Sequence, residues 1–414
     1  MCLQNVLPSV ELPEFQLIGM HETFTNQKML LGFDTGMGKT YTYAGIVRGL
    51  LNRNPEKKHV LIIINDSIEQ VPKDVSSLCE VSVQAFNGAE DTTGRLKFFW
   101  GRTSIFCLTL EAFRVQGVVE FLFQKLPEIE SLVIDEAHHA SNWNTSDTAF
   151  MLRAFAKWVP YVVELSATPM TRESKQFYRL QNLLDRNASM HRDETFRGRY
   201  VDRYLPVNRE DYELKGNYTP TLVIVKPTLE QMQPQHGIVF KSIKGTGATP
   251  QIKALVETVK ERLSRGKRVL VYVHYHDTRE WVENNFQDQG IGYVALHGRI
   301  RKREERQQIL DEFRQGNVDV LVTSVTESLN IEADVVIFYE FTTAVKQVIG
   351  RAHRGLKGKD LEVVFVITEN SDEVEFFLKY IYERSLTIQK LLQKDYSELI
   401  AIGERVEKLR LSED

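Results

Sequence analysis

The sequence contains little that would place the protein outside a reducing, aqueous environment. Three cysteines occur in 414 residues, at positions 2, 79 and 107, without a Cys-x-x-Cys pair or a metal-ligand spacing. No apolar run approaches the roughly 20 residues that span a bilayer. Residues 1–15 include acidic side chains but lack the basic region of a signal peptide. We therefore expect free thiols, a reducing compartment and no membrane partner.

An excess of positive charge is also missing. The formal net charge is −4, which excludes a uniformly basic surface but leaves room for local basic patches. With 42% hydrophobic and 26% charged residues the composition is that of an ordinary globular protein. The length of 414 residues is too great for one ordinary core and predicts two or three domains.

Apolar runs of strand length alternate with helical stretches in two parts of the chain. Continuous apolar runs such as residues 60–64 are typical of strands that are buried on both faces of a parallel sheet. The expected strands of the first part are 28–33, 59–64, 82–85, 104–109, 131–135 and 161–166. Those of the second part are 269–273, 292–296, 318–323, 335–339 and 361–368, with helices at 251–265, 278–289, 302–316 and 345–351. The predicted fold class is α/β, with two tandem domains that each hold a mostly parallel sheet flanked by helices.

Three segments follow from this pattern. Residues 1–184 form the first domain, residues 185–247 a linker or accessory segment, and residues 248–414 the second domain, which ends in a helical stretch. Arginines, tyrosines and four prolines interrupt the pattern in the linker, where a small β element is expected at 221–225.

The most informative motif is Phe33-Asp34-Thr35-Gly36-Met37-Gly38-Lys39-Thr40, between an apolar strand and a helix. Backbone N–H groups of such a loop can surround a polyphosphate, so Thr35 to Thr40 are the predicted nucleotide-binding residues. Lys39 would reach the β- and γ-phosphates and the Thr40 hydroxyl would bind Mg²⁺. Phe33 departs from the pattern, in which a glycine begins the loop, and the alternative is an accidental glycine-rich turn.

A pair of carboxylates, Asp135 and Glu136, lies at the end of the apolar strand expected at 131–135. Carboxylates at the carboxyl end of a strand in an open α/β sheet face the ligand crevice. Asp135 would hold Mg²⁺ and Glu136 would orient the attacking water, whereas the simpler interpretation is a solvated acidic pair.

The second domain contains Gln347, Arg351 and Arg354 at spacings of four and three, which place them on one face of a helix. Arginines supplied from another lobe stabilise the charge that develops during phosphoryl transfer. The alternative is a solvated basic helix face.

In their order, Gly-Lys-Thr, Asp-Glu-Ala-His, Ser166-Ala167-Thr168 and Gln-x-x-Gly-Arg-x-x-Arg resemble the motifs of superfamily 2 helicases and translocases. The resemblance implies two RecA-like lobes, with ATP and Mg²⁺ in the cleft between them and nucleic acid across their top. Gln16 matches the glutamine that reads adenine. The strand and loop at 60–67, with Asn65 and Ser67, match a segment that touches a nucleic-acid backbone. His297 and the pair Thr323 and Ser324 fall in two further nucleic-acid-binding motifs.

Within that superfamily the chain resembles the Swi/Snf-type double-stranded DNA translocases, on Phe15-Gln16 and on the runs 135–142 and 350–359. Ser328 departs from this pattern because glycine is usual there, and the large insertions of chromatin remodellers are missing. Such a minimal motor resembles compact phage or bacterial repair and recombination helicases. The implied location is the cytoplasm of a bacterium or of a virus-infected cell, with a nuclear location still open.

Two basic clusters are candidates for nucleic-acid contact. The linker interleaves arginines, Arg199 among them, with aromatic residues that include Tyr204, and such aromatic faces can stack on bases. Arg299 belongs to the second cluster, at 299–303. Either cluster could instead be a solvated surface.

These observations predict an ATP-dependent DNA helicase or translocase that acts as a monomer on duplex, forked or branched DNA in replication, recombination or repair. Three alternatives stay open: an RNA helicase, the motor subunit of a restriction system, and a non-catalytic ATP-gated DNA-binding switch.

Overall fold

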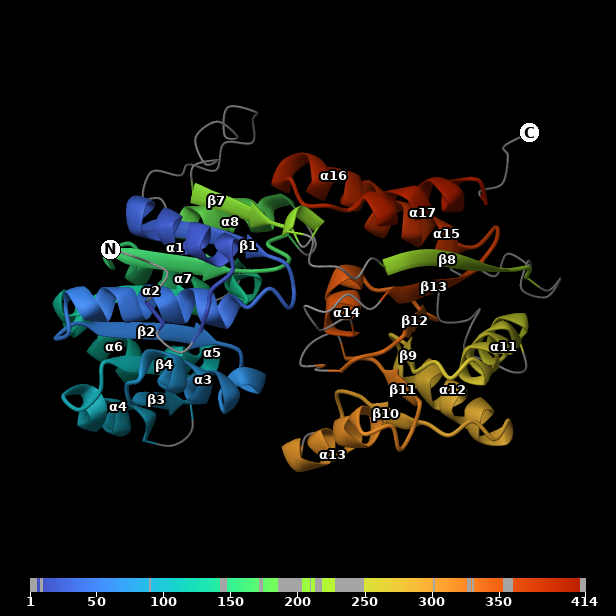
Figure 1. The fold of residues 1–414 in the computed structure, drawn as a ribbon, viewed down its shortest axis with the longest axis horizontal. Coiled ribbons are helices and arrows are strands. Elements are labelled where there is room, and N and C mark those ends of the chain that lie inside the picture. The colour runs from blue at the N-terminus through green and yellow to red at the C-terminus, as the bar shows by residue number, and fades with distance from the viewer. Residues whose placement is uncertain are drawn as a thin grey trace. The chain divides into compact units, whose positions relative to one another are not determined.

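The structure is a computed structural model, shown in Figure 1. It describes residues 6–7, 10–88, 91–141, 147–170, 174–184, 203–208, 210–212, 218–227, 249–300, 302–325, 329, 331–352 and 360–409. The chain divides into two compact units, Met1–Asn208 and Arg209–Asp414. None of the helices in the described ranges is long and apolar enough to cross a membrane.

The first unit is built on a seven-stranded sheet in which every neighbouring pair is parallel. The strand order is β3-β4-β2-β5-β6-β1-β7. The strands are β1 (Lys28–Phe33), β2 (Lys58–Ile63), β3 (Val83–Phe86), β4 (Ile105–Thr109), β5 (Ile129–Ile134), β6 (Tyr161–Leu165) and β7 (Tyr204–Val207). Parallel pairing brings the carboxyl ends of all these strands to one edge, which is where ligands of open α/β sheets bind.

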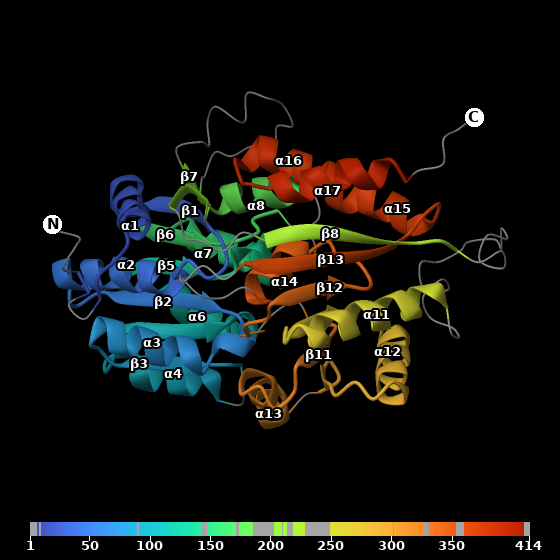
Figure 2. The ribbon, with the colours of Figure 1, turned by 45° about the vertical axis from the view of Figure 1, so that its right-hand side comes forward.

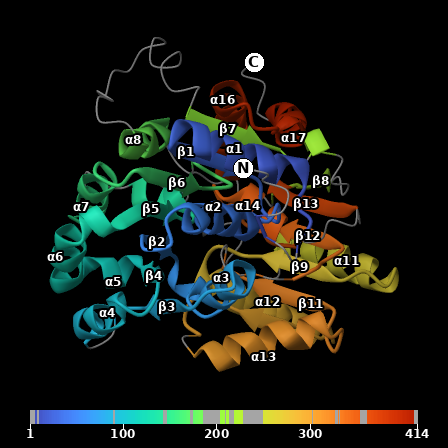
Figure 3. The same cartoon turned by 60° about the vertical axis from the view of Figure 1, so that its left-hand side comes forward.

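Helices cover both faces of this sheet (Figure 3). Those on one face are α1 (Glu14–Asn26), α2 (Lys39–Arg53) and α3 (Gln70–Cys79). The remaining helices of the unit are α4 (Thr92–Trp100), α5 (Leu110–Arg114), α6 (Gln116–Gln124), α7 (Asp147–Ala156) and α8 (Ser174–Leu184). A core of aliphatic and aromatic side chains fills the space between strands and helices, where the Trp100 ring stacks on Phe106 at 4.8 Å.

The second unit repeats the design with six parallel strands in the order β10-β11-β9-β12-β13-β8. The strands are β8 (Tyr218–Val225), β9 (Val269–Tyr272), β10 (Val294–Leu296), β11 (Val320–Thr323), β12 (Val335–Phe338) and β13 (Leu361–Thr368). The helices are α11 (Pro250–Ser264), α12 (His276–Asp288), α13 (Arg303–Arg314), α14 (Val345–Ala352), α15 (Asp372–Phe377), α16 (Glu383–Leu392) and α17 (Ser397–Glu407). A π-helical turn, Leu378–Tyr382, joins α15 to α16.

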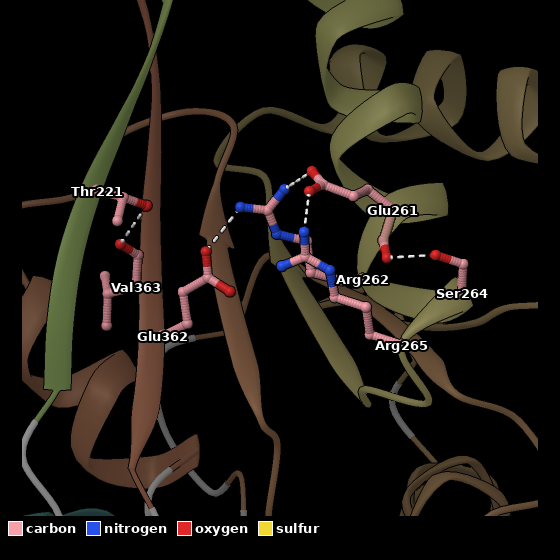
Figure 4. Close-up of polar contacts among 7 residues, drawn as sticks. All are labelled: Thr221, Glu261, Arg262, Ser264, Arg265, Glu362 and Val363. Carbon is pink, nitrogen blue, oxygen red and sulfur yellow. Dashed lines mark hydrogen bonds and ion pairs between the residues drawn. The ribbon is translucent and has the colours of Figure 1, made fainter.

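Strand β8 is firmly built into the edge of this second sheet. It pairs with β13 over its whole length, from Tyr218 opposite Leu361 to Val225 opposite Thr368. Figure 4 shows the Thr221 hydroxyl donating to the Val363 carbonyl, and Arg262 of α11 paired with Glu362 at 2.7 Å. Helix α17 lies along β8 and α15 contacts β13 (Figure 2).

The predicted α/β fold with two parallel sheets is confirmed. The predicted strands of the two domains lie within two residues of the observed ones, and the β element expected at 221–225 begins three residues earlier, at Tyr218. The segment 185–247 differs from the expected linker, since β7 extends the first sheet and β8 extends the second. The contacts accordingly divide the chain after Asn208. Strand β7 was not expected, because Pro206 lies inside it. Its place at the edge of the sheet is one where proline is tolerated.

Candidate nucleotide site

The loop that follows β1 has the backbone of a phosphate-binding loop. Gly36 and Gly38 have φ angles of 84° and 71°, which glycine adopts readily, and α2 begins directly at Lys39. Phe33 stands where a glycine is usual, but its side chain is fully buried and packs edge-on against Phe15 at 5.9 Å. The departure at Phe33 therefore fills the core and leaves the geometry of the loop intact.

Gln16 of α1 reaches the loop from a distant part of the sequence. Its Nε2 atom donates to the carbonyl oxygens of Met37 at 3.0 Å and of Gly38 at 3.3 Å. Its Oε1 atom is buried and, among the described residues, has no hydrogen-bond partner. A buried amide oxygen without a donor is costly, so this acceptor is suited to a ligand that offers an N–H group.

Lys39 and Glu136 meet at the carboxyl ends of β1 and β5. Lys39 Nζ lies 2.7 Å from Glu136 Oε1, and both side chains are largely shielded from water, with 13% and 9% of their surface exposed. The predicted phosphate-binding lysine and the predicted catalytic carboxylate are thus in direct contact. An entering phosphate would compete with Glu136 for the lysine ammonium.

The turn after β5 is strained at Glu136, whose φ is 47°. A non-glycine residue in this left-handed region costs on the order of 1 kcal/mol, and such strain gathers at functional sites. The Asp135 carboxylate supports the turn, since its Oδ1 accepts a hydrogen bond from the Glu136 amide at 3.0 Å. The turn therefore presents two carboxylates at the edge where the phosphate-binding loop lies.

His138 links this turn to the next strand, a role that the sequence pattern does not assign to it. Its Nδ1 lies 3.0 Å from the Ser166 hydroxyl oxygen, and this oxygen accepts a hydrogen bond from the Thr168 amide at 3.2 Å. The same Nδ1 lies 3.5 Å from Glu136 Oε2. His138 thereby couples the carboxylate turn to Ser166-Ala167-Thr168. Only the order of the two motifs in the sequence could have suggested this link.

The residues of the first unit fit a nucleotide. A Cβ placed on Gly36 would meet no heavy atom within 4 Å, so the space before the loop is open, and Thr35 and Thr40 are partly exposed. Asp135 and Thr40 provide oxygen atoms of the kind that Mg²⁺ prefers. Among the described residues, no group of three or more histidine, cysteine or carboxylate side chains is arranged to hold a metal ion.

Two of the three candidate residues of the second unit lie on α14. Gln347 is buried, Arg351 is partly exposed, and they stand four residues apart on this two-turn helix. Arg354 lies outside the described residues.

Candidate nucleic-acid contacts fall into different environments. Asn65 is exposed and Ser67 half-buried in the short turn after β2, at the same edge as the phosphate-binding loop. In the second unit Arg299 is exposed, while His297 and Ser324 are partly buried. Desolvation and the nearby Arg279 lower the pKa of His297, so this imidazole is neutral near pH 7.

Two other candidates are engaged inside the fold, and one lies outside the described residues. The Thr323 hydroxyl is buried and accepts from the Val325 amide at 3.0 Å. The Tyr204 ring packs against Phe177 at 5.2 Å and closely over Gly32. These contacts weigh against base stacking by Tyr204 and against direct phosphate contact by Thr323. Arg199 lies outside the described residues.

Family models match both units. The DEAD/DEAH box helicase model matches residues 14–177, and the helicase conserved C-terminal domain model matches residues 250–355. The chain belongs to the superfamily 2 helicases. It carries both conserved domains of this ATP-hydrolysing family, and the finer Swi/Snf-type resemblance stays a prediction.

Curated relatives of this helicase-family chain include two UvrABC system B proteins. That of Mannheimia succiniciproducens is 28% identical over 68% of this chain and 41% of its own length. That of Thermodesulfovibrio yellowstonii is 26% identical over 57% of this chain and 38% of its own length. The chain therefore spans about two fifths of the length of these relatives.

Solved structures support the fold. The Hef helicase domain of Pyrococcus furiosus matches with a TM-score of 0.58 and 18% identity, covering 91% of this chain and 99% of that domain. The Dbp5 protein of Saccharomyces cerevisiae, bound to RNA and ADP-BeF3, matches with a TM-score of 0.56 and 13% identity over 96% and 97% of the two chains. The tandem RecA-like architecture of the helicases is thereby confirmed.

Proposed function

We propose that the protein is an ATP-dependent DNA translocase or helicase that acts on duplex, forked or branched DNA in repair or recombination. The contact between Lys39 and Glu136 at the open phosphate-binding loop carries the ATPase part of this proposal. The likeness to UvrABC system B proteins favours DNA repair over RNA metabolism. The chain would work as a monomer in a bacterial cytoplasm or a virus-infected cell.

Each residue of the first unit has a separate task in this proposal. Gln16 accepts from the adenine amino group, the Gly36–Thr40 backbone binds the phosphates, and Lys39 moves from Glu136 to the β- and γ-phosphates. Glu136, released from the lysine, then orients the attacking water. Asp135 and Thr40 would hold Mg²⁺, which neutralises the charge on the phosphates.

Gln347, Arg351 and Arg354 would complete the site from the second unit. A guanidinium cannot lose its proton, so it can stabilise the charge that spreads over the γ-phosphoryl oxygens in the transition state. Domain closure with each ATP, and reopening after hydrolysis, would move the units along DNA. Asn65, Ser67, His297, Arg299 and Ser324 are the candidate backbone contacts.

The proposal is tested by ATP turnover with forked DNA, Holliday junctions, plain duplex, single strands and RNA. We expect DNA to stimulate turnover more than RNA, and Glu136→Gln to abolish turnover while ATP still binds. Glu111→Gln, at an exposed glutamate of α5, is the matched control, and Lys73→Met, at an exposed lysine of α3, is the corresponding control for variants of Lys39. Stronger stimulation by RNA would favour an RNA helicase, and ATP binding without turnover in the unmodified chain would favour a switch.

A further inference from the structure

Lys346 ties α14 to the C-terminal extension, which we define as residues 372–409. Its Nζ atom donates a hydrogen bond to the Asp395 carbonyl and lies 4.4 Å from the centre of the Tyr396 ring. The same Nζ atom lies 6.0 Å from the centre of the Tyr218 ring of β8. Both rings are buried, with 8% of their surface exposed. The lysine therefore lies among a carbonyl and two aromatic rings, which favour a cation.

The position of this lysine in its helix is unfavourable without those contacts. Lys346 is the second residue of α14, and the amino end of a helix carries a partial positive charge that disfavours a cation. Gln347 follows it directly, and Arg351 lies a little more than one turn further along. Together with the buried side chains of α14, the held Lys346 limits the rotation of this two-turn helix about its axis, and with it the direction of both side chains.

The Asp395 carbonyl belongs to a turn that is stabilised by side-chain hydrogen bonds. The Asp395 carboxylate accepts from the Ser397 amide at 3.0 Å and from its hydroxyl at 2.7 Å, where α17 begins. Helix α17 packs on β8 and on the π-helical turn. A Cβ on Gly403 would overlap the Tyr382 ring, so the backbone of α17 packs directly against this turn.

These elements lie outside the matched family models. The helicase C-terminal domain model ends at residue 355, and β8 falls between the two models. Strand β8 and the extension form one body, because β8 pairs with β13 and α17 covers β8. Through Lys346, strand β8 and the extension contact the helix that carries Gln347 and Arg351.

We propose that the C-terminal extension sets the catalytic competence of Arg351, and that Lys346 is the positioning residue through which it acts. This inference rests on the proposed ATPase function. Without the ammonium, the buried side chains of Val345, Val348 and Ile349 still hold α14 in the core. The first turn gains rotational freedom, and an error of about 1 Å in a group that stabilises a transition state can cost up to roughly 100-fold in rate.

The test uses the full chain with Lys346→Met and Lys346→Arg, and with Lys253→Met at an exposed lysine of α11 as the matched control. We measure DNA-stimulated kcat and KM for ATP, and the affinity for fluorescent ADP with and without aluminium fluoride, which mimics the transition state. For Lys346→Met we expect kcat to fall about tenfold, with KM and ADP affinity within twofold of the unmodified chain. The affinity gained from aluminium fluoride should fall about tenfold too. Lys346→Arg keeps the positive charge and a hydrogen-bond donor, so it should recover most of kcat and most of the affinity gained from aluminium fluoride.

Other outcomes overturn the inference. Unchanged kcat in Lys346→Met contradicts it, as does a fall in kcat that leaves the gain from aluminium fluoride untouched. If Lys346→Met fails to fold, Tyr396→Leu removes one ring and keeps the carbonyl contact, and it should lower kcat about threefold; unchanged kcat there is equally contradictory. Arg351→Ala separates the two proposals. Normal turnover in Arg351→Ala refutes the role of that arginine in the proposed function, whereas normal turnover in Lys346→Met beside an inactive Arg351→Ala refutes only this inference.

Discussion

Removing the Lys39 ammonium should destabilise the first unit considerably more than neutralising Glu136. Lys39→Met leaves the Glu136 carboxylate in a site where the residue is 8% exposed, and removing one partner of a buried ion pair costs about 3 kcal/mol. Glu136→Gln leaves an amide oxygen that still accepts from the Lys39 ammonium 2.7 Å away, so we expect a loss of about 1 kcal/mol. The variant that combines Lys39→Met with Glu136→Gln should be more stable than Lys39→Met alone, because it leaves no unpaired buried charge.

Hydrogen exchange of the β1 and β5 amides in the intact chain measures these losses locally, since a chain of two units need not unfold in one step. A loss of about 3 kcal/mol accelerates exchange more than 100-fold, and about 1 kcal/mol accelerates it roughly fivefold. Lys73→Met is the control. Exchange in Lys39→Met that matches this control would refute the reasoning that the pair is buried and interacting.

Three further predictions concern other groups. Burial raises the pKa of the Glu164 carboxyl well above 4.5, so the folded chain keeps a proton that the unfolded chain loses, and stability falls as pH rises above about 4.5. We expect the free energy of unfolding of Glu164→Gln, measured with urea, to rise relative to that of the unmodified chain by up to about 1.4 kcal/mol per pH unit in that window. A difference that does not change with pH would contradict this. Gly38→Ala should weaken fluorescent-ATP binding at least tenfold, because a Cβ there would collide with the Gln16 side chain at a φ of 71°, and unaltered affinity would disprove the proposed loop geometry. Burial raises the pKa of Cys79 to about 12 and raises that of Cys107, so maleimide should modify these two thiols only after unfolding, which mass spectrometry of labelled peptides can check.

The regular part of the fold was predictable because the local signals agree with the tertiary structure. The run at 60–64 is apolar on successive positions, and β2 is buried on both faces as this pattern requires. The glycine loop before α2 and the turn with Asp135 and Glu136 were predictable for a related reason, since each directly follows such a strand, while their roles in nucleotide binding stay a prediction.

The rest depends on contacts between distant residues. β7 contains Pro206, and only its pairing with β1 makes it a strand. Nothing near position 346 in the sequence indicates that this lysine meets Asp395, 49 residues further on. Likewise, the link from His138 to Ser166 crosses from one strand end to the next. Tyr204 looked like a residue for stacking on bases because aromatic and basic residues alternate around it, whereas its ring fills the space above Gly32.

The central claim is that DNA stimulates ATP hydrolysis at the loop of Lys39 and the carboxylate of Glu136. The most direct measurement compares ATP turnover on forked DNA in the unmodified chain and in Glu136→Gln, with ATP affinity measured in parallel. The account predicts DNA-stimulated turnover in the first and bound but unhydrolysed ATP in the second. Turnover in Glu136→Gln that equals that of the unmodified chain would contradict it.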